Sequence, residues 1–412
     1  HRDLYQRFGY GLTEPSTVGA ARRCIWFHAA SVGEVLGLQP IIAALHARFP
    51  QLPVAVSTFT PAGKKMAQGV LTEATAVFLL PLDFPWMMRR LVRRLQPHAL
   101  IVQETELWPH LFRAASRQQV PIAVVNGRVS PRAFTRYRWG RPFMRRVLSD
   151  VTLVLAQSED NARRFQCLGA PSKRVCVVGN TNIDRALLAA EQPAQPHPLA
   201  PLLCGKRVLV GGSTHEGEET ALLDVYRHVQ AQHPDLCLVL APRHLERVET
   251  VIRHVQAAGY RALRRSRCDP HRPPEDIEAS CVLILDTLGE LSTLYSLCTI
   301  AFVGGSLIPI GGHNILEPAV YAKPVIFGPH MQHFPQLAAM LCDAGGAVQV
   351  QNETDLRRCI TRILAHPEEG RTMGKQALRA LAANRGALDR TTRALTELLI
   401  QNSASPLTAK NV

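Results

Sequence analysis

The chain has 412 residues, of which 46% are hydrophobic and 6% aromatic, values that are ordinary for a soluble α/β protein with about two domains. Its 47 Lys and Arg residues exceed its 33 Asp and Glu residues, and the resulting net charge of +14 indicates an anionic partner. The ten cysteines include no C-x-x-C pair, which argues against a disulfide framework or a zinc site. Neither an 18-residue apolar run nor a signal peptide occurs, so no segment is predicted to span a bilayer.

The first half of the chain predicts a repeated pattern of strand and helix. Helical spacing of apolar residues falls between most of the candidate strands, for example over residues 38–49. Strands that alternate with helices predict a parallel sheet with helices on both faces. The candidate strands are residues 24–29, 54–58, 76–80, 99–103, 122–126, 152–156 and 175–178.

Residues 190–201 contain four prolines in twelve positions and predict a linker between two domains. A second strand–helix series follows it, with candidate strands 207–211, 236–241, 282–286, 300–303, 324–327 and 347–350. The fold class is therefore α/β, with two doubly wound parallel sheets that face each other across a cleft. We expect a first domain over 1–188, a linker over 189–202, a second domain over 203–383, a helix over 384–401 that returns to the first domain, and a tail over 402–412.

The motif FHAASVGEVLGL (residues 27–38) places Glu34 in the turn between a predicted strand and the next helix. In α/β folds this turn faces the ligand crevice, and the helix N-terminus attracts anions. A phosphate-binding loop would carry Gly, Ser or Lys here, whereas a carboxylate repels a phosphate. Glu34 therefore suits a general base or a group that binds a hydroxyl. The alternative is a surface carboxylate that the helix dipole favours.

Four polar or glycine-rich turns follow strands of the second half. They are GGSTHEGEE (211–219), in which Ser213 and Glu216 fit a helix capping box, APRH (241–244), DTLGE (286–290) and FVGGSLIPIGGHNILEP (302–318). Arg243 suits a phosphate or a carboxylate, and residues 314–317 predict the start of a helix. Together the four turns predict a site for a nucleotide or a nucleotide sugar. The fingerprints of P-loop NTPases and NAD-dependent Rossmann enzymes are missing from the sequence.

Two arginine-rich segments, residues 86–95 and 128–146, combine basic and aromatic side chains. Such combinations suit an anionic membrane surface, although either segment alone is equally well explained as a solvated helix face. No helix-turn-helix, zinc finger or RNA-binding signature accompanies the charge, so nucleic acid is not the predicted partner. The side chains that we assign to an acceptor or membrane surface are Arg89, Arg90, Arg93, Arg128, Arg136, Arg138 and Trp139.

The ordered motifs HAASVGE, QETELWP, GGSTHEGEE, APRH, DTLGEL, FVGGSL and GGHNILEPA resemble the bacterial 3-deoxy-D-manno-octulosonic acid (Kdo) transferases of lipopolysaccharide synthesis, over nearly the whole chain. The resemblance implies a GT-B fold, with the acceptor in the first Rossmann-like domain and the donor nucleotide in the second. It implies inverting transfer of Kdo from CMP-Kdo to the lipid A precursor (lipid IVA), without a metal or another cofactor. Family members usually carry an N-terminal anchor just before the segment where this chain begins. We therefore expect a peripheral or monotopic enzyme on the cytoplasmic face of the bacterial inner membrane.

The resemblance also implies roles for individual residues. Glu34 is the general base, and Glu104 helps to stabilise the transition state, unless it merely pairs with Arg128. Where the family usually has a lysine, this chain has Asn182, so another cation (Arg128, Arg185 or Arg243) would have to cover the leaving group. The donor-binding residues implied are Pro242, Arg243, Leu288, Gly289, Glu290, Asn314, Ile315, Leu316 and Glu317, with Ser213 and Thr214 as further candidates.

Among the donor residues, we assign Arg243 and the helix start at Asn314 to the phosphate, and Glu317 to the ribose hydroxyls. His313 is either part of this site or a hydrogen-bonded loop residue and nothing more. Two other functions remain open. One is a different GT-B nucleotide-sugar transferase or epimerase. The other is a degenerate homologue that only binds a lipid surface, against which the retention of Glu34, Glu104 and the donor loops argues.

Overall fold

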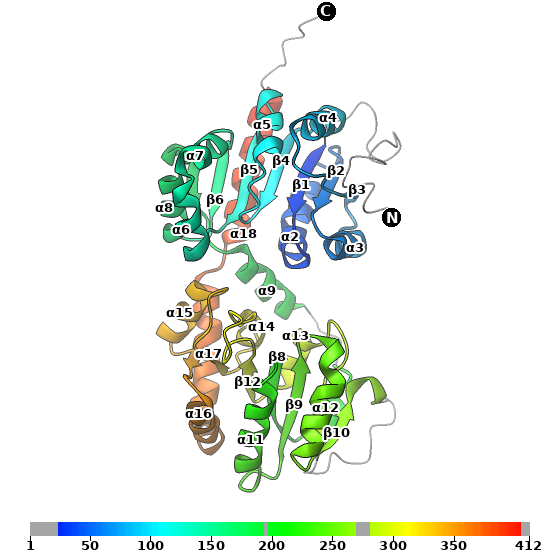
Figure 1. The fold of residues 1–412 in the computed structure, drawn as a ribbon, viewed down its shortest axis with the longest axis vertical. Coiled ribbons are helices and arrows are strands. Elements are labelled where there is room, and N and C mark those ends of the chain that lie inside the picture. Colours follow the sequence, from blue (N-terminus) through cyan, green and yellow to red (C-terminus); the bar gives the residue numbers. More distant parts are fainter. Residues whose placement is uncertain (1–23, 193–196, 269–280, 405–412) are drawn as a thin grey trace, which may run out of the picture. The chain divides into compact units, whose positions relative to one another are not determined.

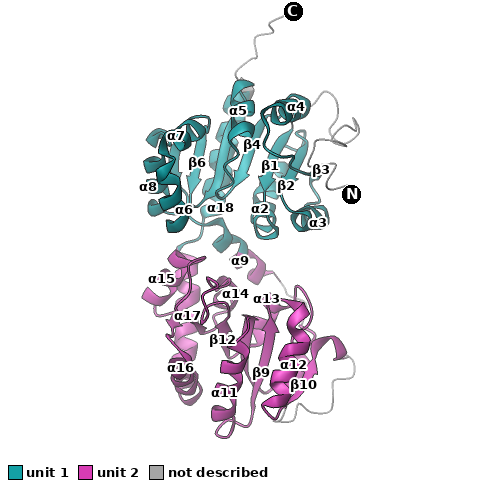
Figure 2. Cartoon of the chain, viewed as in Figure 1, with its two compact units in different colours: residues 1–185, 384–412 teal, residues 186–383 magenta. Residues whose placement is uncertain are grey.

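The computed structural model describes residues 24–192, 197–268 and 281–404, and Figures 1 and 2 show the two compact units that it contains. One unit is His1–Arg185 with Asn384–Val412, and the other is Ala186–Ala383. The first division lies inside helix α9 (Thr181–Glu191), whereas the sequence analysis places it in the linker 189–202. Helix α9 is continuous up to Glu191, so the chain passes between the units before the proline-rich segment begins.

The first unit is built on a seven-stranded parallel sheet with the order β3-β2-β1-β4-β5-β6-β7. All seven strands predicted for this half are confirmed, with ends that differ by one or two residues. The strands are β1 (Ile25–Ala29), β2 (Val54–Thr58), β3 (Ala74–Leu79), β4 (Ala99–Gln103), β5 (Ile122–Gly127), β6 (Leu153–Ala156) and β7 (Val175–Val177). Besides α9, the helices are α2 (Val32–Arg48), α3 (Pro61–Val70), α4 (Pro85–Leu95), α5 (Pro109–Arg117), α6 (Pro131–Trp139), α7 (Arg141–Ser149), α8 (Glu159–Leu168), η1 (Ser172–Arg174) and α18 (Ala387–Ala404).

Helices cover both faces of this sheet. Buried side chains of α4, α5, α7 and α8, such as Phe112 and Phe165, form the core on one face. Those of α2, α3 and α18, such as Leu38 and Leu395, form the core on the other. Because both faces are buried, the strands are nearly continuous apolar runs, and this is why they could be predicted. The carboxylate of Asp184 accepts hydrogen bonds from the main-chain nitrogens of Gly386 (2.7 Å) and Leu388 (3.0 Å), which ties the last helix to α9 within the first unit.

The second unit has a seven-stranded parallel sheet with the order β10-β11-β9-β8-β12-β13-β14. Six of its strands were predicted. The exception is β10 (Arg261–Arg264), a basic strand at the edge of the sheet with no apolar run. The other strands are β8 (Arg207–Thr214), β9 (Leu236–Pro242), β11 (Cys281–Ile284), β12 (Ile300–Val303), β13 (Val325–Phe327) and β14 (Ala347–Gln349). The helices are α10 (Ala200–Leu203), α11 (Glu218–Gln230), η2 (Leu245–Arg247), α12 (Val248–Ala257), η3 (Arg265–Arg267), α13 (Leu291–Leu294), η4 (Tyr295–Leu297), α14 (Leu316–Ala319), α15 (Pro335–Asp343), α16 (Glu353–Ala365) and α17 (Pro367–Ala383).

In both sheets the strand order reverses beside the first strand. The reversal lies between β1 and β4 in the first sheet and between β8 and β12 in the second. In the first unit, α2 after β1 and α5 after β4 pack on opposite faces, so the two loops diverge and leave a crevice at the carboxyl ends of the strands. Ligands of open α/β sheets bind at such switch points. The motifs around Glu34 and Glu104 follow β1 and β4, and the glycine-rich motifs follow β8 and β12.

Candidate active site

Glu34 lies in the first turn of helix α2, so the prediction that it lies in the turn before this helix is wrong. Ser31 is the N-cap of α2, and its hydroxyl accepts a hydrogen bond from the Glu34 nitrogen at 3.5 Å. The Glu34 carboxylate in turn accepts hydrogen bonds from the Ala30 nitrogen at 2.9 Å and from Ser31 Oγ at 3.0 Å. This reciprocal capping starts the helix at Val32, and it holds the carboxylate in a fixed position after β1.

Burial, together with the nearby carboxylates of Glu104 and Glu106, raises the pKa of Glu34 to about 7. Its hydrogen bonds from Ala30 and Ser31 act in the opposite direction but do not outweigh burial. Burial, followed by the charge of Glu104, also raises the pKa of Glu106. A carboxyl group whose pKa lies near 7 is present in both protonation states at neutral pH, which is the property that a general base needs.

Glu104 directly follows β4 and has a left-handed backbone with φ 55°. Its Oε2 atom lies 3.1 Å from Nη2 of Arg128, so the ion pair that the sequence analysis left open is present. The hydroxyl of Thr105 also donates to the carbonyl oxygen of Arg128. These contacts join the loops after β4 and β5. Arg128 therefore has a partner in the candidate site, and we no longer assign it to the basic surface.

Asn182 lies in the first turn of α9, where its nitrogen donates to Oδ1 of Asn180 at 3.0 Å. A Cβ atom on Gly37 of α2 would lie 3.3 Å from Asn182 Oδ1 and 2.7 Å from Gln103 Nε2, so both side chains lie beside Gly37. Gln103 is fully buried, and neither of its amide atoms has a hydrogen-bond partner. The sequence analysis missed Gln103, although it is the first residue of the QETELWP motif. Two neutral polar side chains, Gln103 and Asn182, therefore lie beside Gly37, which is three residues after Glu34 in α2.

In the second unit, the buried carboxylate of Glu218 fixes the two loops at the switch point. Its Oε2 atom accepts hydrogen bonds from the nitrogens of His215 (3.0 Å) and Gly305 (2.7 Å). Its Oε1 atom accepts from the nitrogens of Ser306 and Leu307, both at 3.0 Å. Burial raises the pKa of Glu218, while the four N–H donors act in the opposite direction. The sequence analysis did not single out Glu218, because GGSTHEGEE offers three glutamates and no signal that distinguishes them.

The predicted capping box of Ser213 and Glu216 is wrong. Strand β8 continues to Thr214, and α11 begins at Glu218 with Gly217 as its N-cap. Ser213 has a left-handed φ of 54° within the strand. Thr214 is fully buried and its hydroxyl has no hydrogen-bond partner, while its carbonyl oxygen accepts from the nitrogen of Arg243 at 3.0 Å. The pairing of β8 with β9 therefore determines the conformation here, because it extends to Thr214 and Pro242.

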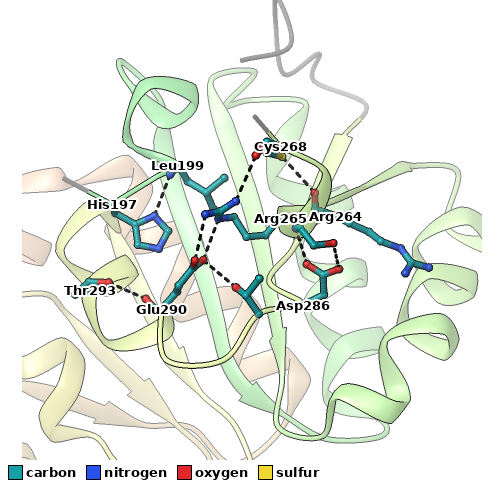
Figure 3. A network of polar contacts seen from close by, with 10 residues as sticks. His197, Leu199, Arg264, Arg265, Cys268, Asp286, Glu290 and Thr293 are labelled. Atoms are coloured by element: carbon teal, nitrogen blue, oxygen red, sulfur yellow. Dashed lines mark hydrogen bonds and ion pairs between the residues drawn. The ribbon is translucent and has the colours of Figure 1, made fainter. Parts of the chain in front are cut away.

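The other donor-loop candidates differ in what they can offer a ligand. Pro242 ends β9 and is buried, whereas the following Arg243 is exposed. In the turn after β11, Leu288 is 78% exposed and Gly289 has φ 84°. Figure 3 shows that the Glu290 carboxylate is engaged within the protein, with Arg265 Nε at 2.9 Å and Nη2 at 3.1 Å. Glu290 also accepts from the Thr287 hydroxyl at 2.8 Å, so it stabilises the turn and its carboxylate is not free for a ligand.

The helix start predicted at Asn314 is two residues early. Helix α14 has four residues and begins at Leu316. Asn314 Oδ1 accepts from the Leu316 nitrogen at 3.2 Å, and Asn314 Nδ2 donates to Glu317 Oε1 at 3.1 Å. The side chains of Ile315 and Leu316 are buried, so only their main chains can contact a ligand.

Histidines border the same loops. Nε2 of His215 lies 2.8 Å from Nε2 of His313, and the two rings are parallel to within 2°. His244, next to Arg243, lies with its ring centroid 5.5 Å from that of His215. Burial and the neighbouring cations lower the pKa of His215, and they lower that of His313 to about 4. His313 is therefore part of a side-chain cluster at the switch point.

The predicted basic surface is exposed on α4 and α6. Trp139 is 90% exposed, and Arg89, Arg90 and Arg93 lie on the solvent side of α4. Arg136 and Arg138 lie on α6, which has no buried residue. A groove of about 440 Å³ lies between α4, α5 and α7, and its lining includes Arg89, Arg113, Arg117, Phe143 and Arg146. The surface therefore combines arginines with exposed aromatic rings.

The described parts of the chain contain no group of three or more histidine, cysteine or carboxylate side chains arranged to hold a metal ion. Within the same ranges, no helix is long and apolar enough to cross a bilayer.

The two doubly wound parallel sheets give the chain the GT-B fold. UDP-GlcNAc 2-epimerase from Neisseria meningitidis bound to UDP-GlcNAc has a similar fold, with a TM-score of 0.64 and 16% identity over 92% of this chain and 99% of that one.

The sequence defines the family more closely. Residues 2–185 match the family model described as 3-deoxy-D-manno-octulosonic-acid transferase (kdotransferase). The 3-deoxy-D-manno-octulosonic acid transferase of Haemophilus influenzae is 32% identical over 89% of this chain and 85% of its own length. That of Bordetella pertussis is 33% identical over 95% of this chain and 91% of its own length. The chain therefore belongs to the Kdo transferase family and is a glycosyltransferase.

We predict that Glu218→Gln loosens the glycine-rich loop. The amide of glutamine carries N–H groups where the carboxylate has an oxygen, so it cannot accept hydrogen bonds from all four main-chain nitrogens. Each hydrogen bond to a charged group contributes about 1.5–3 kcal/mol. Hydrogen exchange of the Gly305, Ser306 and Leu307 amides should accelerate at least about tenfold, as measured by mass spectrometry or NMR. The control is Glu216→Gln, which changes an exposed glutamate of the same motif and should leave these rates unchanged. Equal rates in both variants would contradict the role of Glu218.

Proposed function

We propose that the chain transfers Kdo from CMP-Kdo to a lipid A precursor, lipid IVA, by a single inverting displacement without a metal. The observation that carries this proposal is the position of the Glu34 carboxyl group at the switch point of the first sheet, where Ala30 and Ser31 hold it by hydrogen bonds and burial raises its pKa to about 7. Inversion in one step requires the acceptor hydroxyl to attack the anomeric carbon from the side opposite the leaving CMP. A base must take up the proton of that hydroxyl. Glu34 supplies that base.

In the proposed step, the acceptor hydroxyl donates a hydrogen bond to the ionised Glu34 carboxylate. Its oxygen attacks the anomeric carbon of Kdo as the proton passes to Glu34, and the electrons of the breaking bond leave with the CMP phosphate. General-base assistance of this kind contributes about 10²–10⁴ in rate. Glu104 contributes its negative charge, which raises the pKa of Glu34, and it orders Arg128.

The donor occupies the second unit in this proposal. Arg243, which is exposed after β9, neutralises the phosphate, and Glu317 binds the ribose hydroxyls. Main-chain groups of residues 288–290 and 314–316 line the nucleotide, because the Glu290 carboxylate is engaged by Arg265 and the side chains of Ile315 and Leu316 are buried. Ser213 completes this edge, and the buried Thr214 contributes through its main chain.

The acceptor is a lipid, so the enzyme must work at a membrane surface. We assign contact with anionic lipid on the cytoplasmic face of the inner membrane to the basic surface of α4 and α6. Trp139 and Trp86, which are 90% and 61% exposed, suit the interface between head groups and acyl chains.

A second candidate is a UDP-sugar transferase or epimerase, since the N. meningitidis epimerase with the same fold was solved with UDP-GlcNAc. The two functions differ in the base of the donor nucleotide, which is cytosine in CMP and uracil in UDP. Competition by CMP and not by UDP at the donor site supports the Kdo transferase, and competition by UDP alone supports the alternative.

We predict that Glu34→Gln abolishes catalysis without loss of donor binding. Glutamine keeps the size and hydrogen bonding of the side chain but cannot take up the proton, so transfer should fall by about 10²–10⁴. Transfer of labelled Kdo, from CMP-Kdo generated in situ, to tetraacyl lipid A precursor in detergent measures the rate, and calorimetry with CMP measures binding. The control is Glu159→Gln, which alters another carboxylate in the first turn of a helix, α8, and should transfer at the wild-type rate. A wild-type rate in Glu34→Gln would rule out the base.

We also predict that the protein binds anionic vesicles and that added salt weakens the binding, because exposed charges are screened. Replacing Arg89, Arg90 and Arg93 together by Gln should reduce binding in a vesicle sedimentation assay. The matched control replaces Arg358, Arg371 and Arg379, which are exposed on α16 and α17, and removes the same charge. Equal losses in the two triple variants, or binding that does not depend on salt, would contradict the assignment of this surface.

A further inference from the structure

We propose that His215 and His313 form a proton-sharing pair that takes up one additional proton when the phosphate of the donor nucleotide binds beside Arg243. The pair then carries a positive charge at the phosphate from which the sugar departs. This inference rests on the donor site proposed above, and it adds two positioning residues and a coupling between donor binding and proton uptake.

The geometry of the pair fixes its protonation states. A distance of 2.8 Å between two Nε2 atoms is a hydrogen bond, so one ring carries the proton and the other accepts it. The neutral pair therefore holds one ring protonated at Nε2 and one ring protonated at Nδ1. An additional proton enters at Nδ1 of the donating ring and produces an imidazolium that donates to a neutral imidazole. Protons on both Nε2 atoms would clash, so the pair accepts one charge and not two.

The main chain holds the two rings together. The nitrogen of His215 donates to Glu218, and the same carboxylate binds the nitrogens of residues 305–307. The His313 ring packs against Gly305, where an added Cβ atom would lie 2.9 Å from the ring, and the nitrogen of Gly312 donates to the Gly305 carbonyl at 2.7 Å. Glu218 therefore anchors both segments that carry the pair.

The charges around the pair explain why an anion would change its protonation. Arg243 and His244 from the end of β9 act on both rings, Arg247 from η2 acts on His215, and His333 acts on His313. After burial, which is the largest cause, these groups lower the pKa values of both histidines. The opposing carboxylate, Glu219, is bound by Arg247 at 2.7 Å. The pair is therefore neutral at neutral pH as long as these cations are unopposed.

A phosphate bound to Arg243 would reverse this balance. It would neutralise a cation that disfavours protonation, and it would add an attractive negative charge. The pKa of the pair rises in the bound state, so binding takes up a proton, and donor affinity increases as pH falls toward the pKa of the free pair. The charge of the phosphate group also grows when the phosphodiester of the donor becomes the monoester CMP. The protonated pair would then stabilise the added negative charge. Asn182 cannot do so, because its side chain is neutral.

Calorimetry of CMP binding to the full chain tests the inference. Repeating the titration at pH 7 in buffers with different ionisation enthalpies gives the number of protons taken up per nucleotide. The variants are His215→Gln and His313→Gln, and the control is His228→Gln, an exposed histidine of α11. The ionisation of CMP itself is common to all four proteins and cancels in the comparison.

We expect the wild type and His228→Gln to take up the same fraction of a proton, and each pair variant to take up clearly less. Uncharged cytidine should cause no uptake in any of them. CMP binding with equal uptake in all four proteins overturns the inference and leaves the donor site intact. If CMP does not bind the wild type, the proposed donor site fails and the inference fails with it. If a pair variant does not bind CMP, the ¹⁵N chemical shifts of the histidine rings are compared in the wild type with and without CMP. If these shifts show that the protonation state of the pair does not change, the proposal is wrong.

Discussion

The reversal of strand order in each sheet is the constraint on which the rest of the structure depends. Because β4 lies beside β1 and β12 beside β8, consecutive connections leave the sheet on opposite sides at these two points. The loops that follow these strands can therefore contain polar side chains, which could not be buried on the faces of the sheet that helices cover. Glu34 and Glu104 stand at one reversal, and His215 and the glycine-rich loop stand at the other.

The two reversals have opposite electrostatic character. At the first, burial and then the charges of neighbouring carboxylates raise the pKa values of Glu34 and Glu106, and a proton acceptor near neutral pH results. At the second, Arg243 acts on a cluster of histidines, and a group of cationic and titratable side chains of this kind suits a phosphate. Left-handed backbone conformations at Glu104 and Ser213 mark both sites. Such conformations cost free energy and persist where the surrounding structure holds them, often at functional sites.

The sequence predicts the strands well, because a sheet covered on both faces requires continuous apolar runs, and 13 of the 14 strands in the described ranges were predicted from such runs. Strand β10 does not, since an edge strand with Arg261 and Arg264 can leave its side chains in solvent. Motifs also singled out Glu34 and Glu104, which follow β1 and β4, and the loops that follow β8 and β12. Which glutamate of GGSTHEGEE is buried could not be predicted, because the four donors to Glu218 come partly from a loop about 90 residues away. The burial of Ile315 and Leu316 and the engagement of Glu290 by Arg265 likewise depend on contacts distant in sequence.

In the mechanism that we propose, Glu34 is a carboxyl group whose proton affinity is matched to base catalysis at neutral pH. The measurement that tests it most directly is a titration of the protein labelled with ¹³C in its glutamate carboxyl groups, with Glu34→Gln used to assign the signal. We predict a midpoint near pH 7 for Glu34, well above the ordinary value of 4.5. A midpoint close to 4.5 would contradict the account, because the carboxylate would then be too weak a base at neutral pH for the role proposed here.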